Sequence, residues 1–173
     1  MTSLFIVGPP GVGKTTITRF LLGYNVILVE KPKWTIGLGS CAVGHYSGQT
    51  FDGGDTVPYN GVNDCLDFWN KELLPKQQLS LTMFDGDRFS NRGVIDFFVE
   101  RNIRVLAVHI NAPEEKLEQR RKERGSNQNA SWIKGRITKA RRFADMVEHL
   151  DIYDVHPVQA AIKIQEFLHE RSK

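Results

Sequence analysis

The sequence predicts a doubly wound α/β fold with a parallel five-stranded sheet, and three observations support this prediction. Short apolar runs alternate with helical patterns along the whole chain. These runs are mostly continuous rather than alternating, as in parallel strands that helices cover on both faces. The 173 residues suffice for one sizeable core. We therefore expect a single domain over residues 1–173, with right-handed connections between its strands.

The expected elements follow one another in a regular βα order. The five strands are expected at Leu4–Val7, Val26–Val29, Leu79–Phe84, Val105–Ile110 and Ile152–Val155. The six helices are expected at Lys14–Leu22, Val62–Leu74, Asn91–Arg101, Glu114–Arg124, Ser131–Leu150 and Pro157–Arg171. Pro157 suits the first turn of its helix, and Pro113 precedes a helix that begins with two acids.

Two regions interrupt this order. The first, Lys31 to Asn60, is rich in Gly, Pro, Asp and Ser and is too long for an ordinary connection, so we expect a substrate-binding insertion at about 31–78. The second is the polar gap GSNQNA at 125–130, which separates two basic helices. It predicts a short lid at about 120–142.

Composition excludes several classes of protein. With 40% hydrophobic and 25% charged residues the chain is typical of globular proteins. It has no run of 18 apolar residues, so no membrane partner is expected, and Leu4–Val7 is too short for a signal peptide. Cys41 and Cys65 lack the spacing of a metal site, which favours free thiols and a cytoplasmic location.

Positive charge is concentrated in one part of the chain. Lys116 to Arg142 holds ten basic and two acidic residues, a local charge of +8, whereas the whole chain carries +3. A solvated helix face is one interpretation. The other is a cationic surface for a polyanion, either the phosphates of a nucleotide or a nucleic-acid backbone.

The segment GPPGVGKTT, Gly8 to Thr16, matches the P-loop pattern and lies between an expected strand and an expected helix. In such a loop, glycines let backbone N–H groups surround a phosphate, and the helix N-terminus adds its dipole. The lysine reaches the β- and γ-phosphates and the hydroxyl binds Mg²⁺. We therefore expect ATP and Mg²⁺ as cofactors, with ATP-binding residues Gly8, Gly11, Val12, Gly13, Lys14, Thr15 and Thr16.

The remaining residues favour a kinase over a switch or a motor. The chain has no NKxD segment, which a switch GTPase uses to read its base. The strand that ends in LTMFDGDRFS places Asp85 where a second Mg²⁺ ligand is needed beside Thr15. Arg120 and Arg124 lie four residues apart on one helix face, so both can point at one nucleotide. We predict Lys14, Asp85, Arg120 and Arg124 as catalytic residues, and Arg120 also as an ATP-binding residue.

These motifs resemble those of the adenylate and thymidylate kinase superfamily of small P-loop kinases. The resemblance covers the whole chain and implies a P-loop kinase fold. It also implies that Arg88, in the segment FDGDR, contacts an acceptor phosphate and that Glu30 belongs to the substrate site. The gap from Arg124 to Trp132 leaves no room for the lid domain of adenylate kinase.

The acceptor is indicated by the segment GHYSGQTFDGGDTVPYNG, Gly44 to Gly61. It holds two acids, Asp52 and Asp55, and two tyrosines, Tyr46 and Tyr59, all expected in the substrate site. Aromatic rings can stack on a base, and an acid can take the proton of a hydroxyl. A monophosphate acceptor needs no such acid, so the acid-rich segment favours an alcohol acceptor.

The GGDT sequence, the compact lid and the basic element WIKGR resemble the phage P-loop kinases of thymine hypermodification. The resemblance implies phosphorylation of the hydroxymethyl group of 5-hydroxymethyluracil within DNA, and therefore a DNA partner in a host cytoplasm. Trp132, Lys134 and Arg136 would then contact the substrate. A free nucleotide or nucleoside kinase is the alternative, and a nucleotide-dependent DNA-binding module without transfer activity is another.

Overall fold

The computed structural model describes residues 1–48, 52–76 and 78–171. Seven strands form one sheet in the order β2-β3-β4-β5-β1-β6-β7. They span β1 (Thr2–Val7), β2 (Ile27–Glu30), β3 (Lys33–Gly37), β4 (Ser40–Val43), β5 (Leu81–Asp85), β6 (Arg104–Asn111) and β7 (Glu148–Tyr153). The five neighbouring strands β4, β5, β1, β6 and β7 run parallel to one another. At the other edge, β3 pairs antiparallel with both β2 and β4. The α/β fold is therefore confirmed.

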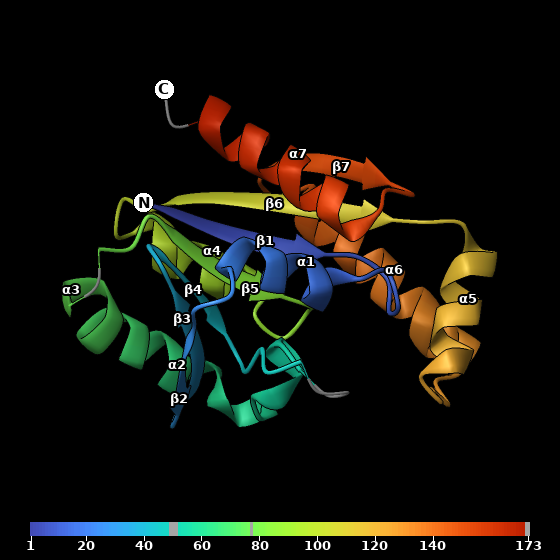
Figure 1. Cartoon of the computed structure of the whole chain (residues 1–173), viewed down its shortest axis with the longest axis horizontal. Coiled ribbons are helices and arrows are strands. Elements are labelled where there is room, and N and C mark those ends of the chain that lie inside the picture. Colours follow the sequence, from blue (N-terminus) through green and yellow to red (C-terminus); the bar gives the residue numbers. More distant parts are fainter. Residues whose placement is uncertain (49–51, 77, 172–173) are drawn as a thin grey trace.

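Helices cover both faces of this sheet (Figure 1). They are α1 (Lys14–Leu22), α2 (Val62–Phe68), α3 (Leu74–Lys76), α4 (Arg92–Val99), α5 (Glu114–Glu123), α6 (Ala130–Ala144) and α7 (Pro157–Glu170). In β1, Leu4 and Ile6 pack in one hydrophobic cluster and Phe5 and Val7 in another. This division explains why the apolar run is continuous, since both sides of the strand are buried.

The strand count differs from the prediction because the insertion contains two strands. β3 and β4 form a hairpin joined by Leu38 and Gly39, within a stretch whose Gly, Lys and Ser residues resemble a loop. The predicted parallel strand at Val26–Val29 is instead the antiparallel edge strand β2, with Ile27 68% exposed. β4, which was not predicted, is the strand that pairs parallel with β5.

Two of the predicted helices differ from the structure by more than one or two end residues. The helix expected over Ser131–Leu150 ends at Ala144, and β7 begins at Glu148. β7 pairs with β6 in register from Leu106 opposite Glu148, so pairing along the neighbouring strand overrides the local helical pattern. The helix expected over Val62–Leu74 is present as α2, the π-helical turn η3 (Trp69–Leu73) and α3.

Two further expectations are tested by the described residues. Cys41 and Cys65 are both free and buried, as predicted. Within the described ranges, no helix is both long and apolar enough to span a membrane.

Candidate functional site

The phosphate loop connects β1 to α1 at the carboxyl edge of the sheet. Gly8 lies so close to the end of β6 that a Cβ there would overlap the carbonyl oxygen of Ile110. A larger residue would therefore separate the loop from the sheet. Val12 is buried in the core beneath the loop, and Thr15 and Thr16 continue into α1. Packing against β6 and the core therefore fixes one side of the loop. The other side faces the candidate nucleotide site.

Lys14 is the first residue of α1, and its amine turns back over the loop. The Lys14 Nζ donates hydrogen bonds to the carbonyl oxygens of Gly8 and Pro9, each at 3.0 Å. Burial lowers the pKa of Lys14, whereas the carboxylates of Asp85 and Asp55 act in the opposite direction. The amine is therefore held at the phosphate loop beside two acids, where a phosphate can replace the carbonyl oxygens as its partner.

Asp85 ends β5 next to the phosphate loop, as predicted. It is 6% exposed, and its Oδ2 has no hydrogen-bond partner among the described residues. Burial raises the pKa of Asp85, while the Thr15 hydroxyl and the Lys14 charge act against this rise. An orphaned carboxylate oxygen beside a hydroxyl is the kind of oxygen pair that Mg²⁺ binds together with phosphate and water oxygens. Thr15 and Asp85 therefore fit the metal site that the sequence predicts.

The GGDT segment packs directly against this oxygen pair. A Cβ built on Gly53 would lie 2.7 Å from Asp85 Oδ2 and 3.1 Å from Thr15 Oγ1. Gly53 also has a φ of +81°, in the left-handed region. Gly54 begins the 3₁₀ helix η1 (Gly54–Thr56), and its N–H favours the ionised form of Asp85. The two glycines let the insertion approach Asp85 and Thr15, the predicted metal ligands.

The two predicted acids of the insertion have different surroundings. Asp52 accepts hydrogen bonds from the Arg19 guanidinium at 2.7 Å, from the Ser47 N–H and hydroxyl, and from the Gly48 N–H. Burial alone would raise the pKa of Asp52, but these donors outweigh it, and the pKa is lowered. Asp52 thus fastens its loop to α1. The Asp55 side chain, by contrast, is 80% exposed and lies 3.9 Å from the Arg88 guanidinium.

Of the two predicted tyrosines, one is exposed. Tyr59 belongs to the 3₁₀ helix η2 (Tyr59–Gly61) and is 74% exposed, with the Arg88 guanidinium 4.2 Å from its ring centre. Tyr46 is only 3% exposed, so its ring is not available to stack on a substrate base. Burial raises the pKa of Tyr46 well above its usual value, and the Asp85 charge adds to this effect. Tyr46 therefore belongs to the core near Asp85, and not to an open substrate surface.

Helix α5 packs against the phosphate loop and brings the predicted arginines near it. The Arg120 guanidinium donates to the Gly11 carbonyl oxygen at 3.4 Å. Arg124 is exposed, and its charge is close enough to lower the pKa of Lys14. Arg121 was not predicted as a site residue: it is 7% exposed, pairs with Glu114, and has an unpartnered Nη1. The Arg121 side chain lies against Gly11, and this packing of α5 on the phosphate loop is visible only in the tertiary structure.

The basic element of α6 is held to the loop that follows β5. Arg136 pairs with Asp87, and its guanidinium lies 4.7 Å from the centre of the Trp132 ring. Lys139 donates to the Asp87 carbonyl oxygen at 2.9 Å. Arg136 thus has intramolecular partners, whereas Trp132 is 37% exposed and Lys134 is exposed to solvent.

Glu30 lies apart from this cluster. It ends β2, three strand positions from β5, which corresponds to roughly 14 Å across the sheet. Its side chain is 75% exposed and lies 3.9 Å from the His45 imidazole. The structure therefore groups Lys14, Thr15, Asp85, Asp55, Arg88, Tyr59, Arg120 and Arg124 near the phosphate loop. Glu30 lies at the same edge of the sheet but three strands away.

Comparisons with known proteins give the family and the fold. The profile of the family described as P-loop Nucleotide Kinase3 matches residues 33–162. The chain is also similar to the solved tunicamycin resistance protein of Deinococcus radiodurans, with a TM-score of 0.55 and 19% identity over 96% of this chain and 95% of that one. At that identity the likeness concerns the fold alone. No curated protein matches the chain.

The matched region contains Asp85, the GGDT segment and the basic helices, and the phosphate loop immediately precedes it at the edge of the same sheet. The chain therefore belongs to the P-loop nucleotide kinase 3 family.

Proposed function

We propose that this protein is an ATP-dependent kinase that transfers the γ-phosphate to a hydroxyl group, the hydroxymethyl group of 5-hydroxymethyluracil in DNA. The observation that carries the proposal is the position of Asp55. Asp55 directly follows Gly53 and Gly54, which pack against Asp85, and its exposed carboxylate acts to raise the pKa of both Lys14 and Asp85. A carboxylate beside the phosphate site can accept a hydroxyl proton.

On the donor side, the phosphate loop and its surroundings would hold ATP. Backbone N–H groups and Lys14 bind the β- and γ-phosphates, and Arg120 and Arg124 supply charge from α5. Thr15 and Asp85 would hold Mg²⁺, which when bound offsets negative charge on the phosphates.

On the acceptor side, the hydroxyl oxygen attacks the γ-phosphorus. The new phosphorus–oxygen bond forms while the bond to the oxygen that bridges the β- and γ-phosphates breaks, and ADP leaves. The hydroxyl proton passes to Asp55. The exposed ring of Tyr59, with the Arg88 guanidinium against it, offers a surface on which the acceptor base can stack.

From the sequence alone, Asp52 was an equal candidate for the acid that accepts the hydroxyl proton. The contacts of Asp52 make it less suitable than Asp55. Four donors already occupy the oxygens of Asp52, and a lowered pKa makes it a poor proton acceptor. Asp85 faces the Thr15 hydroxyl and is better suited to the metal.

A free nucleotide or nucleoside kinase is the second candidate, because the family is described as one of nucleotide kinases and because Arg88 can bind an acceptor phosphate. The two candidates differ in chemistry. A monophosphate acceptor is already ionised and needs no proton acceptor, whereas a hydroxymethyl group benefits from one.

The test is transfer of label from ATP to 5-hydroxymethyluracil DNA, ordinary DNA and free deoxynucleoside monophosphates in one buffer. We expect label on the modified DNA alone, and Asp55→Asn should slow this transfer roughly a hundredfold or more. Asp64→Asn, an exposed acid on α2, is the matched control and should leave the rate unchanged. Label only on the monophosphates would overturn the DNA acceptor, and an active Asp55→Asn would overturn the role of Asp55.

A further inference from the structure

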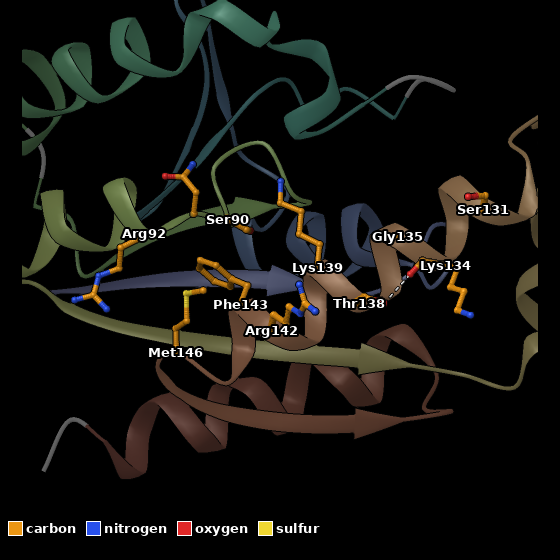
Figure 2. Close-up of a pocket in the computed structure, with 11 residues that line it drawn as sticks. Ser90, Arg92, Ser131, Lys134, Gly135, Thr138, Lys139, Arg142, Phe143 and Met146 are labelled. Carbon is orange, nitrogen blue, oxygen red and sulfur yellow. Dashed lines mark hydrogen bonds between the residues drawn. The ribbon is translucent and has the colours of Figure 1, made fainter.

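A pocket of about 590 Å³ lies between α6 and the start of α4, outside the phosphate loop. Four cationic side chains line it: Arg92, Lys134, Lys139 and Arg142. None of its described lining residues is acidic. We call this cavity the α6 pocket; Figure 2 shows that Lys134, Thr138, Lys139 and Arg142 line it from α6, and Ser90 and Arg92 from the segment that leads into α4.

The lining residues follow one face of α6. Ser131, Lys134, Thr138 and Arg142 recur every three or four residues, the spacing of a single helix face. From Lys134 to Arg142 the helix rises roughly 12 Å. A nucleotide monophosphate presents one phosphate, whereas a nucleic-acid strand presents one for about every 3.4 Å of duplex. The row of cations is therefore long enough for several consecutive phosphates.

Two of the four cations have no acidic partner. Lys139 interacts with Asp87, and Arg92 pairs with Asp96 at 2.9 Å. Across the described parts of the chain, no carboxylate pairs with Lys134 or Arg142. The segment from Arg124 to Ala144 holds six cationic residues and no acid, so α6 itself offers no competing carboxylate. Lys134 and Arg142 are thus available to an external anion.

The α6 pocket adjoins the candidate acceptor site. At its upper end in Figure 2, Lys139 points towards the loop that carries Ser90. Ser90 donates to the Gly86 carbonyl oxygen at 2.6 Å, and Lys139 donates to that of Asp87. Both partners directly follow Asp85. A strand seated in the pocket would therefore lead to the site of transfer.

We propose that the α6 pocket binds phosphate groups of the nucleic-acid strand that carries the acceptor base, with Lys134 and Arg142 as the principal contacts. This inference rests on the proposed function and extends it to the part of the substrate that does not react. Under this proposal, Lys134 and Arg142 account for part of the positive charge of Lys116–Arg142.

The experiment measures binding of a labelled, unmodified single-stranded oligonucleotide at several salt concentrations, with ADP and Mg²⁺ present to fill the phosphate loop. The double variant Lys134→Gln/Arg142→Gln should weaken binding tenfold or more at low salt. It should also reduce the slope of log affinity against log salt by about 1.4, since each phosphate contact to a single strand contributes about 0.7. The control Arg104→Gln/Lys163→Gln removes the same charge from exposed positions on β6 and α7 and should bind like the wild type.

Two results would overturn the inference. Equal weakening in both double variants would mean that net charge, and not the pocket, governs binding. In the second, the Lys134→Gln/Arg142→Gln variant would bind the oligonucleotide as tightly as the wild type, but free thymidine monophosphate would no longer compete with that binding. This result would assign the pocket to a mononucleotide. The assay measures binding of unmodified DNA and involves no phosphate transfer. A negative result for the kinase reaction and a negative result for DNA binding in the pocket can therefore be told apart.

Discussion

At the scale of the single residue, we expect Asp85 to have opposite effects on stability and on function. Its carboxylate is buried, and burial raises its pKa in the folded state. A raised pKa favours folding below the ordinary value of 3.8, and this contribution is lost as the pH rises through the folded-state pKa. At neutral pH the ionised group therefore destabilises the ligand-free protein.

Asp85→Asn should accordingly raise the melting temperature of the ligand-free protein at pH 8, and this gain should shrink as the pH falls towards 3.8. The same variant should lose most of its Mg²⁺-dependent turnover, because an amide does not offset the metal's charge. Thermal melts across this pH range, paired with metal titrations of the rate, check both effects. A variant that is no more stable at pH 8, or that keeps its turnover, would contradict the assignment.

Gly53 allows the insertion to lie close to the side chains of Asp85 and Thr15. Gly53→Ala adds a Cβ that would lie 2.7 Å from Asp85 Oδ2, besides the strain of a positive φ. Gly23→Ala is the matched control, since its φ is +83° and no atom lies within 4 Å of the added carbon. Both variants should lose stability, but only Gly53→Ala should raise the Mg²⁺ concentration needed for half-maximal turnover and reduce the stabilisation by ADP and Mg²⁺. Similar metal dependence in the two variants would mean that Gly53 serves backbone conformation alone.

At the scale of the element, α5 packs against the phosphate loop. Arg120 contacts the loop backbone, and Arg124 lies in the exposed last turn near Lys14. Because they differ in this way, the two arginines should differ in kinetic effect although they share a helix face.

We expect Arg124→Ala to lower kcat roughly a hundredfold, because its charge is needed most when negative charge spreads over the transferred phosphate. Arg120→Ala should chiefly raise the KM for ATP, since its contact is made to the loop before any reaction. Steady-state kinetics of both variants separate the effects, with Lys122→Ala, an exposed residue of α5, as the control. Wild-type kinetics in both arginine variants would mean that the face is merely solvated.

At the scale of the whole molecule, nucleotide binding should be measurable as stability. ADP with Mg²⁺ at about 100 times its Kd should raise the free energy of unfolding by about 2.7 kcal/mol. For a chain of this size, that corresponds to a melting temperature higher by ~5–10 °C. Lys14→Ala should fold normally but lose most of this shift and slow transfer about a thousandfold. A full shift or near-normal turnover in Lys14→Ala would contradict nucleotide binding at this loop.

Positive charge is distributed unevenly over the whole molecule. The +8 of Lys116–Arg142 lies in α5 and α6, at the carboxyl edge of the sheet where the phosphate loop and Asp85 meet. Part of it is neutralised within the chain, as in the pairs of Arg121 with Glu114 and Arg136 with Asp87. The net attraction for a polyanion is therefore smaller than the count of residues suggests.

The sequence by itself determined the features that depend on local pattern. Continuous apolar runs predicted the strands that lie under helices, and the spacing from Gly8 to Thr15 predicted the phosphate loop, because each reflects the conformation of a few consecutive residues. Asp85 could be found for the same reason, since it directly follows such a run. The hairpin of β3 and β4 could not, because β4 is specified by pairing with β5, and β3 by pairing with β2 and β4, rather than by their own composition.

Only the tertiary structure decided which residues of the insertion face the site. Asp52 and Asp55 are equivalent in the sequence, yet Arg19 from α1 binds one and leaves the other exposed beside Lys14. Tyr46 and Tyr59 likewise separate into a buried and an exposed ring. Burial and pairing arise between segments far apart in the chain, and a short sequence pattern carries no information about which distant segment supplies the partner.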